Sequence, residues 1–173
     1  MRPILALAML ILPACTPQVD ESAQRVEFSE ARAGSSEPVA SPDTEAAVWS
    51  PFEQGQLLFG NVGEAPFVSL ACEQGAGDTP LIRFVRHVSA DAEAQAMMAL
   101  IGNGSSGRVP VDATWRGNRW RWEGVLPADA PDWDALTGGG SLEVTVPGAG
   151  TVALPASRAP GEFIARCRDA PVL

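Results

Sequence analysis

The sequence predicts a mainly β protein: a single antiparallel β-sandwich or barrel-like domain with one or two short helices, after a disordered tether. Three observations lead to this prediction. From about residue 53, short apolar runs alternate with Gly, Pro and Asn at the spacing typical of an all-β domain. Two pairs of these runs are joined by hairpin turn residues. Residues 16–51, in contrast, are acidic and poor in large apolar side chains.

The first fifteen residues, MRPILALAMLILPAC, have the layout of an export signal. Arg2 precedes an apolar run from Ile4 to Leu12, and Ala14 lies directly before Cys15. At about 1.5 Å per residue the run covers only about half of the roughly 30 Å hydrocarbon core, so it is too short for a permanent membrane span. We therefore predict a signal peptide over residues 1–14.

The end of this signal, Leu12-Pro13-Ala14-Cys15, resembles a bacterial lipobox. The resemblance implies that Cys15 is acylated on sulfur and becomes the mature N-terminus, which would anchor the chain stably in a membrane. Thr16 follows the cysteine in place of Asp, which by the same resemblance implies outer-membrane sorting in a Gram-negative host, with the domain facing the periplasm. An ordinary signal peptide with a coincidental cysteine is the alternative.

Residues 15–52 are expected to form the lipidated N-terminus and a flexible acidic tether. The stretch from Thr16 to Pro51 has seven acidic residues against two Arg and much Ser, Ala and Pro. Such a segment cannot bury enough apolar surface to offset the entropy lost on ordering. A short helix around residues 21–32 is the alternative, and the all-β domain is placed at residues 53–173.

The domain contains eight predicted strands and one predicted helix. Residues 131–136, ahead of a run of glycines, suggest a short helix. Residues 89–101 fit either a helix or a strand, and we favour a strand over 96–101. The other strands are expected at residues 56–62, 65–73, 80–88, 107–115, 119–126, 141–148 and 150–156.

The clearest hairpin is VDATW-RGNR-WRWEG, with Gly117-Asn118 as a two-residue turn. A second hairpin is expected in SLEVTV-PGAG-TVALP. Because side chains alternate along a strand, the first hairpin has two distinct faces. One face carries Val111, Ala113, Trp115, Trp120 and Trp122; the other carries Asp112, Thr114, Arg116, Arg119, Arg121 and Glu123.

The alternation of Trp and Arg allows two interpretations. The Trp face forms the core and the Arg face is solvated, or the two residue types form a stacking platform for sugars or single strands. Arg116, Arg119 and Arg121 also form a small positive patch on an acidic protein, and we consider this patch a possible binding face for anionic envelope polymers.

The stretch GNGSSG, Gly102 to Gly107, matches the G-x-G-x-x-G letters of a dinucleotide site. Such a site needs a helix that begins inside the motif, because the helix N-terminus holds the pyrophosphate. An alternating run that contains Pro110 follows instead. We therefore predict a flexible loop between strands, not a nucleotide site.

Cys72 and Cys167 are predicted to form a disulfide. If Cys15 carries lipid, these two remain as an even pair in an exported domain, where thiols oxidise. The bond would attach the C-terminal segment 161–168 to the first strands. It would close almost the whole domain, and the chain-entropy model assigns such a loop about 4 to 5 kcal/mol.

Several classes of function are disfavoured by the sequence. A net charge of -9 argues against nucleic acid. No Cys, His or carboxylate group has metal spacing, so no metal or other cofactor is expected. His87 is the single histidine and no G-x-S-x-G elbow is present, so a catalytic triad is not indicated. Glycoside hydrolysis needs a pair of carboxylates, but no spacing in the sequence selects two of the candidates, which are Glu73, Asp78, Asp112 and Glu123.

Two family resemblances concern the domain itself. A cysteine in an early strand (FVSLACEQG) joined to one near the C-terminus resembles the periplasmic inhibitors of C-type lysozyme, and Ser106-Gly107 resembles their Ser-Gly loop. This implies a small β-barrel that inhibits a hydrolase. The C-terminal run LEVTVPGAGTVALPASRAPGEFIARC resembles secreted invasion-associated β proteins. The inhibitors' Ala-Ser-Gly-x-x-Tyr signature is absent, so no functional residue is transferred.

Taken together, these features predict a cell-envelope lipoprotein, anchored in the membrane through Cys15, with a non-catalytic binding or structural β domain. The expected partner is an envelope protein or a cell-wall polymer. A periplasmic hydrolase inhibitor or a small-ligand-binding module is the alternative.

Overall fold

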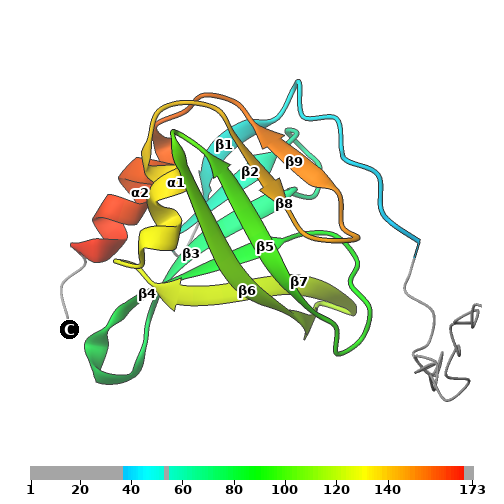
Figure 1. Cartoon of the computed structure of the whole chain (residues 1–173), viewed down its shortest axis with the longest axis horizontal. Coiled ribbons are helices and arrows are strands. Elements are labelled where there is room, and N and C mark those ends of the chain that lie inside the picture. The colour runs from blue at the N-terminus through cyan, green and yellow to red at the C-terminus, as the bar shows by residue number, and fades with distance from the viewer. Residues whose placement is uncertain (1–36, 53–54, 170–173) are drawn as a thin grey trace, which may run out of the picture. The chain divides into compact units, whose positions relative to one another are not determined.

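The computed structural model describes residues 37–52 and 55–169, which form an antiparallel sheet and a few short helices (Figure 1). Nine strands of the described chain belong to one sheet in the order β1-β2-β3-β4-β7-β6-β5-β8-β9, and every neighbouring pair is antiparallel. The strands are β1 (Val48–Phe52), β2 (Gln56–Gly60), β3 (Val68–Gln74), β4 (Pro80–Arg86), β5 (Gln95–Gly102), β6 (Ser105–Arg116), β7 (Arg119–Pro127), β8 (Leu142–Thr145) and β9 (Thr151–Leu154).

The sheet curls into a half-barrel, with β1 and β9 as its two edges (Figure 1). The mainly β prediction is confirmed, in its barrel-like form. A strong twist is expected of a large antiparallel sheet, because each strand twists in the same hand and the twist accumulates from strand to strand. The curvature gives the sheet an inner face, where the core forms, and an outer face that carries the polar side chains.

Most predicted elements are confirmed close to their expected bounds. Residues 95–102 form β5, which settles the ambiguous stretch in favour of a strand. The helix expected at 131–136 is present as a 3-10 turn, η2 (Pro131–Trp133), followed by α1 (Asp134–Thr137). A further 3-10 turn, η1 (Ala76–Asp78), connects β3 to β4. Two elements were not predicted, β1 and the C-terminal helix α2 (Ala159–Arg168).

The domain begins earlier than residue 53. β1 lies in the range that the sequence assigned to the tether, and it pairs with β2 over five residues. Its Trp49 ring packs on Phe59, with 5.1 Å between ring centroids. Farther upstream, the Val39 amide donates to the Gly148 carbonyl at 2.9 Å. The average composition of residues 16–51 is polar, and Trp49 by itself does not change that average. The sequence therefore placed the start of the domain too late. The signal and Cys15 lie outside the described residues.

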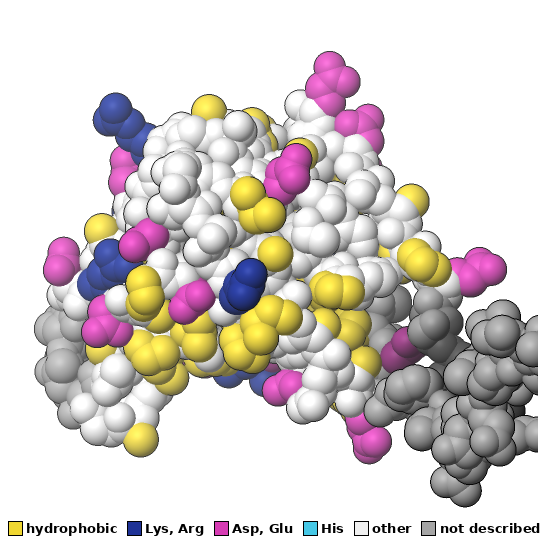
Figure 2. Space-filling view, in the orientation of Figure 1, with side chains coloured by type: hydrophobic (Ala, Val, Ile, Leu, Met, Phe, Trp, Pro, Cys, Tyr) yellow, Lys and Arg dark blue, Asp and Glu magenta, His cyan; other side chains and the backbone are white. Residues whose placement is uncertain are grey.

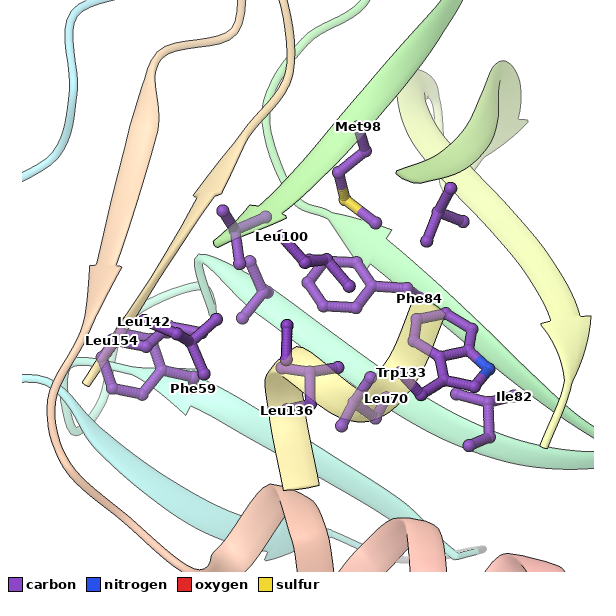
Figure 3. Close-up of a cluster of buried hydrophobic side chains, with 14 of the residues drawn as sticks. Phe59, Leu70, Ile82, Phe84, Met98, Leu100, Trp133, Leu136, Leu142 and Leu154 are labelled. Atoms are coloured by element: carbon purple, nitrogen blue, oxygen red, sulfur yellow. The ribbon is translucent and has the colours of Figure 1, made fainter. Parts of the chain in front are cut away.

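The core fills the inner face of the sheet, and the η2–α1 segment closes it (Figure 3). Trp133 and Leu136 are fully buried among side chains from both halves of the curved sheet. The indole Nε1 of Trp133 donates to the Pro127 carbonyl at 2.9 Å, so its one polar group is satisfied. The other labelled core residues in Figure 3 are Phe59, Leu70, Ile82, Phe84, Met98, Leu100, Leu142 and Leu154.

Charged side chains are scattered over the surface viewed in Figure 1, whereas apolar side chains gather in a band across its lower part (Figure 2). The large apolar residues that are exposed on β5 are Met97 and Ile101, whose side chains are on the outer face. Nothing in the structure shows what would cover this band. Exposed apolar atoms are common on protein surfaces, so the band alone indicates no function.

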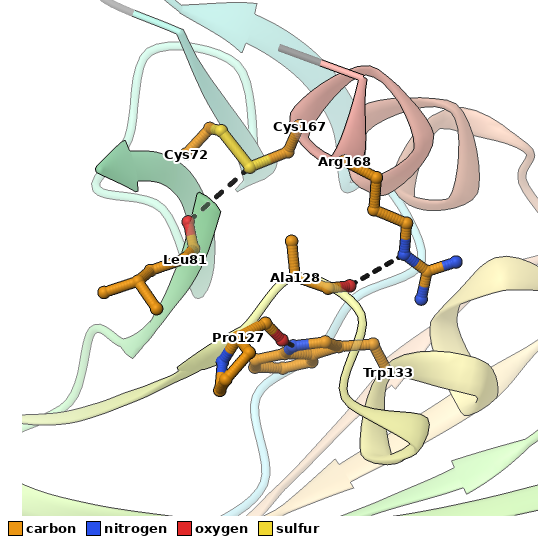
Figure 4. Close-up of a disulfide and its surroundings, with 7 residues drawn as sticks. All are labelled: Cys72, Leu81, Pro127, Ala128, Trp133, Cys167 and Arg168. Atoms are coloured by element: carbon orange, nitrogen blue, oxygen red, sulfur yellow. Dashed lines mark hydrogen bonds between the residues drawn. A yellow bond between two sulfur atoms is a disulfide. The ribbon is translucent and has the colours of Figure 1, made fainter. Parts of the chain in front are cut away.

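The predicted disulfide is confirmed and joins α2 to β3 (Figure 4). Cys72 and Cys167 are 95 residues apart in sequence, and their Cα atoms are 5.6 Å apart. α2 buries Phe163 and Ile164 beside the cysteine, and Arg168 Nε donates to the Ala128 carbonyl at 2.7 Å. Among the described residues, no helix has the length and apolar character needed to cross a membrane.

GNGSSG is an ordered hairpin end, and the prediction of a flexible loop was wrong. Asn103 and Gly104 form a two-residue turn between β5 and β6, both at positive φ, as a type I′ turn requires. The Asn103 side chain donates to the Ala135 carbonyl and accepts from the Gly140 amide, each at 2.7 Å. Gly107 packs so closely on the Asp132 backbone that a Cβ there would overlap the Asp132 carbonyl oxygen. One strand precedes the turn and another follows it, so no helix begins inside the motif. This agrees with the prediction that GNGSSG is not a nucleotide site.

Candidate functional site

The outer face of β3, β4, β6 and β7 carries a connected row of charged side chains. Arg83 on β4 contacts Glu73 through Nε at 2.6 Å and through a second nitrogen at 2.8 Å. The same guanidinium donates to Glu123 Oε2 at 3.0 Å, and Arg116 Nε contacts the other oxygen of Glu123 at 3.3 Å. Glu123 is buried, so two arginines compensate one desolvated carboxylate.

The electrostatic effect of this row is to keep Glu73 and Arg83 charged. The hydrogen bond from Arg83, opposed by partial burial and helped by the charges of Arg83 and Arg116, lowers the pKa of Glu73 below its usual value. The same hydrogen bond raises the pKa of Arg83. Of the four carboxylates considered for glycoside chemistry, the structure places Glu73 and Glu123 on either side of Arg83. Both are committed to ion pairs.

His87 lies at the end of β4 and contacts a serine and an arginine from neighbouring strands. Its Nε2 is 2.7 Å from Ser69 Oγ, and its Nδ1 is 3.3 Å from an Arg121 nitrogen. Burial, followed by the charges of Arg121, Arg86 and Arg119, lowers the pKa of His87 to about 4. The imidazole is therefore neutral at pH 7.

The position of Arg121 decides what the Ser69–His87 pair can do. A guanidinium only donates, so Nδ1 of His87 accepts and the ring proton lies on Nε2. His87 then donates to Ser69 Oγ and has no lone pair there to take the serine proton. In a hydrolytic triad a carboxylate occupies the Nδ1 side, with the opposite polarity. The pair is arranged to hold β3, β4 and β7 together.

Arg86 is a buried cation on the inner face of β4. Its side chain is 3% exposed and donates to the carbonyls of Phe67 at 3.1 Å and Ala149 at 3.2 Å. Burial lowers its pKa to about 10. Its cross-strand neighbour on β7 is Trp122, which is also buried. Arg86 therefore ties the β8–β9 turn to the centre of the sheet.

The three arginines considered as a binding face are on the outer side of the β6–β7 hairpin, but they differ in freedom. Arg116 and Arg119 are directly opposite each other next to the turn, and both are exposed. Arg121 is partly buried, with its guanidinium directed to His87. At the end of the hairpin, Arg119 is accessible, and so is the exposed part of Arg116, whose Nε also contacts Glu123.

The Trp side of this hairpin is only partly core. Trp122 is 7% exposed, whereas Trp115 is 56% exposed and Trp120 is partly buried. The rings of Trp115 and Trp120 meet edge to face, with centroids 5.6 Å apart and planes at 65°. We call residues 115–120, with the Gly117-Asn118 turn at their centre, the Trp–Arg tip. Alternation along the strands predicted the shared face, but not that β6 and β7 extend beyond the core.

Three hollows of the described surface are lined by residues outside this tip. One of about 210 Å³ is lined by the β1–β2 edge and the 60–66 loop, and includes Val48, Leu58 and Val62. A second of about 340 Å³ adjoins Asp43, Glu45 and Asn61, and a third of about 160 Å³ lies beside Arg168. No group of three His, Cys, Asp or Glu residues in the described chain could hold a metal ion.

The arrangement has three parts: the exposed Trp–Arg tip, the row of charges behind it, and a filled inner face.

Ser106 and Gly107, the pair that resembles the Ser-Gly loop of the lysozyme inhibitors, lie in β6, with Gly107 against Asp132. Comparison of the chain with known protein families, with curated proteins and with solved structures found no match.

Proposed function

We propose that this chain is an exported cell-envelope lipoprotein, anchored through Cys15, whose β domain binds a partner and does not catalyse a reaction. The observation that supports export best is the Cys72–Cys167 disulfide, because disulfides persist in oxidising compartments and not in the cytosol. Of the three cysteines in the sequence, Cys15, at the end of the signal-like N-terminus, is the one outside this bond. Acylation is the fate that its sequence context predicts.

The non-catalytic part of the proposal is supported by how the polar side chains are used. Ser69, the serine beside the histidine, accepts a hydrogen bond from His87 Nε2, so His87 has no lone pair there to take the serine proton. The paired carboxylates Glu73 and Glu123 are held by Arg83. These side chains are thus engaged in contacts between strands.

A partner would be an envelope protein or a cell-wall polymer at the outer membrane, on its periplasmic side. The Trp–Arg tip is the surface best suited to such contact, since exposed Trp and Arg dominate binding energy at interfaces.

Inhibition of a periplasmic hydrolase such as lysozyme is the second candidate, and one observation favours it. The Trp–Arg tip is a two-residue type I′ hairpin end supported by the charged row behind it, and so has a shape that can enter an active-site cleft. Titration of lysozyme with the purified protein would show loss of activity at stoichiometric concentration. An Arg119→Ser variant should then bind more weakly. Unchanged lysozyme activity at a large excess would eliminate this candidate.

The anchor is tested by the intact mass of the protein from the membrane fraction of a bacterial host. We expect residues 1–14 to be absent and Cys15 to carry lipid, and Cys15→Ser to release the protein from the membrane. The double variant Cys72→Ser/Cys167→Ser is the matched control and should remain anchored. An unmodified N-terminus downstream of residue 15 would refute the proposal.

Partners are best found by site-specific photo-cross-linking, because the chain has no Lys for amine-reactive reagents. A photoreactive residue at Asn118, in the tip, is compared with one at Glu143, which is exposed on β8. Capture of one envelope component from position 118 and not from 143 would assign the tip as the contact. Equal capture from both positions would argue against a specific surface.

A further inference from the structure

We propose that the Trp–Arg tip contacts an anionic lipid surface, so that the domain is held at the membrane by a second point besides the N-terminal anchor. The inference rests on the proposed function, because it takes the anchor at Cys15 as the first point. It concerns Trp115, Arg116, Arg119 and Trp120.

The first argument is the composition of the tip. The tip, WRGNRW at residues 115–120, contains two of the five Trp and two of the twelve Arg, and no acidic residue, in a chain of net charge -9. A positive, aromatic-rich segment in an acidic protein gives local charge complementarity to an anionic surface.

The second argument is exposure. Trp115 is 56% exposed, and the Arg116 side chain is exposed to the same extent. Indole rings prefer the interface between water and hydrocarbon, where the apolar ring is buried and the N–H remains hydrated. Arg beside them would lie at the level of anionic headgroups. Both chemical requirements of an interfacial contact are therefore met within one hairpin turn.

The third argument is shape, which favours a surface over a chain-like ligand. A sugar ring or a base stacks on an open ring face, but Trp115 and Trp120 are packed edge to face at 65° and do not form a parallel platform. None of the described hollows is lined by tip residues. A two-residue hairpin end whose Trp rings are packed edge to face suits a planar partner better than a polymer strand.

The fourth argument is position and support. In Figure 1 the β6–β7 hairpin turns at the right of the domain, the side on which the described chain begins at residue 37. The tip and the first described residues are therefore on the same side of the domain. Contacts of Arg116 with Glu123 and of Arg121 with His87 hold the strands behind the tip.

A tip with one exposed Trp and two Arg would bind vesicles weakly by itself. When the chain is already anchored, however, the tip samples the surface at a high effective concentration, so that a weak contact becomes populated. The test therefore uses full-length protein attached to vesicles. Attachment is made once through the native lipid and once through an N-terminal His tag on a chelator lipid, so that the tip is tested whether or not Cys15 is acylated.

The measurement is quenching of Trp115 fluorescence by brominated phospholipids. Subtracting the signal of Trp115→Phe from that of the unchanged protein isolates Trp115 among the five Trp. In vesicles of phosphatidylglycerol and phosphatidylethanolamine we expect the Trp115 signal to fall at least twofold with bromine near the headgroups. In phosphatidylcholine alone it should change little. The double variant Arg116→Ser/Arg119→Ser should remove most of the quenching in anionic vesicles.

The control is Arg158→Ser/Arg166→Ser, which makes the same charge change at exposed positions away from the tip and should preserve the quenching. Trp115 that remains unquenched on anionic vesicles, in protein shown by flotation to be attached, would overturn the proposal. So would protection of Trp115 by soluble cell-wall polymer in the absence of vesicles, which would assign the tip to a polymer. Failure of the native anchor alone appears as lost flotation of the untagged protein and leaves the tagged measurement intact.

Discussion

The two ends of β6 carry the same kind of turn in opposite surroundings. At one end Asn103-Gly104 joins β5 to β6, and at the other Gly117-Asn118 joins β6 to β7; all four residues have positive φ. The first turn is packed under η2 and α1, and its Asn side chain holds two backbone groups. The second extends beyond the core with Trp and Arg exposed. Local turn chemistry thus builds both hairpins, and the surroundings decide which one is structural and which is free to bind.

The largest expected effect is at the packed end. Gly107→Ala places a Cβ against the backbone of Asp132, which cannot move without disturbing η2. We expect a loss of about 3 kcal/mol in the free energy of unfolding, measured by urea denaturation. Gly117→Ala, where the space is open, is the control and should cost only about 1 kcal/mol from its positive φ. Equal effects at the two glycines would show that packing does not distinguish the two ends.

Acid should destabilise the folded protein through His87, which contacts Arg121 behind the Trp–Arg tip. Its pKa is about 4 in the folded protein, below the ordinary value of 6.5, so the unfolded chain binds the extra proton between these values. The unfolding free energy therefore falls as pH decreases from about 6.5 to 4, by up to about 3 kcal/mol. Denaturation at a series of pH values measures this. His87→Gln should flatten the curve above pH 5, and an unchanged slope in that variant would assign the effect to other groups.

Removal of each turn asparagine separates local from tertiary contributions. Asn103→Ala and Asn118→Ala both put alanine at positive φ, but only Asn103 bonds to Ala135 and Gly140. We expect Asn103→Ala to cost about 1 to 3 kcal/mol more than Asn118→Ala in thermal or urea unfolding. A difference near zero would mean that these bonds exchange with water at no net cost.

The smallest effect is expected at the exposed arginines. Arg116→Ser and Arg119→Ser should each change the free energy of unfolding by no more than about 0.5 kcal/mol. When Arg116 is replaced, Glu123 still has its ion pair with Arg83, and Arg119 is exposed. Arg121→Ser should cost more, since it removes the donor to His87. A large destabilisation by Arg119→Ser would show that the tip is structural.

Much of the fold follows from alternation and turn residues along the chain. The two-residue turn at Gly117-Asn118, the β8–β9 hairpin and the short helix before Gly138 were all predictable from local chemistry. The disulfide followed from cysteine parity and export. β1 and α2 were not predictable in this way, because both depend on tertiary packing: Trp49 packs on Phe59, and α2 buries Phe163 and Ile164.

The candidate site was predictable only in outline. The sequence placed Arg116, Arg119 and Arg121 on one face, but it could not show that Arg121 is directed to His87 or that Glu123 is buried between two arginines. Those contacts join β3, β4, β6 and β7, which are far apart in the chain. Likewise GNGSSG is rigid because η2 packs on Gly107, a contact with no local signal.

By itself, the sequence determined the strands β2 to β9, the Gly117-Asn118 turn, the cysteine pair and the signal-like N-terminus, because each depends on neighbours within a few residues or on composition. Only the tertiary structure decided which end of β6 is buried, which Trp is exposed and which ring nitrogen of His87 accepts a hydrogen bond. These depend on how far each strand extends beyond the core and on which side chains the curvature of the sheet brings together.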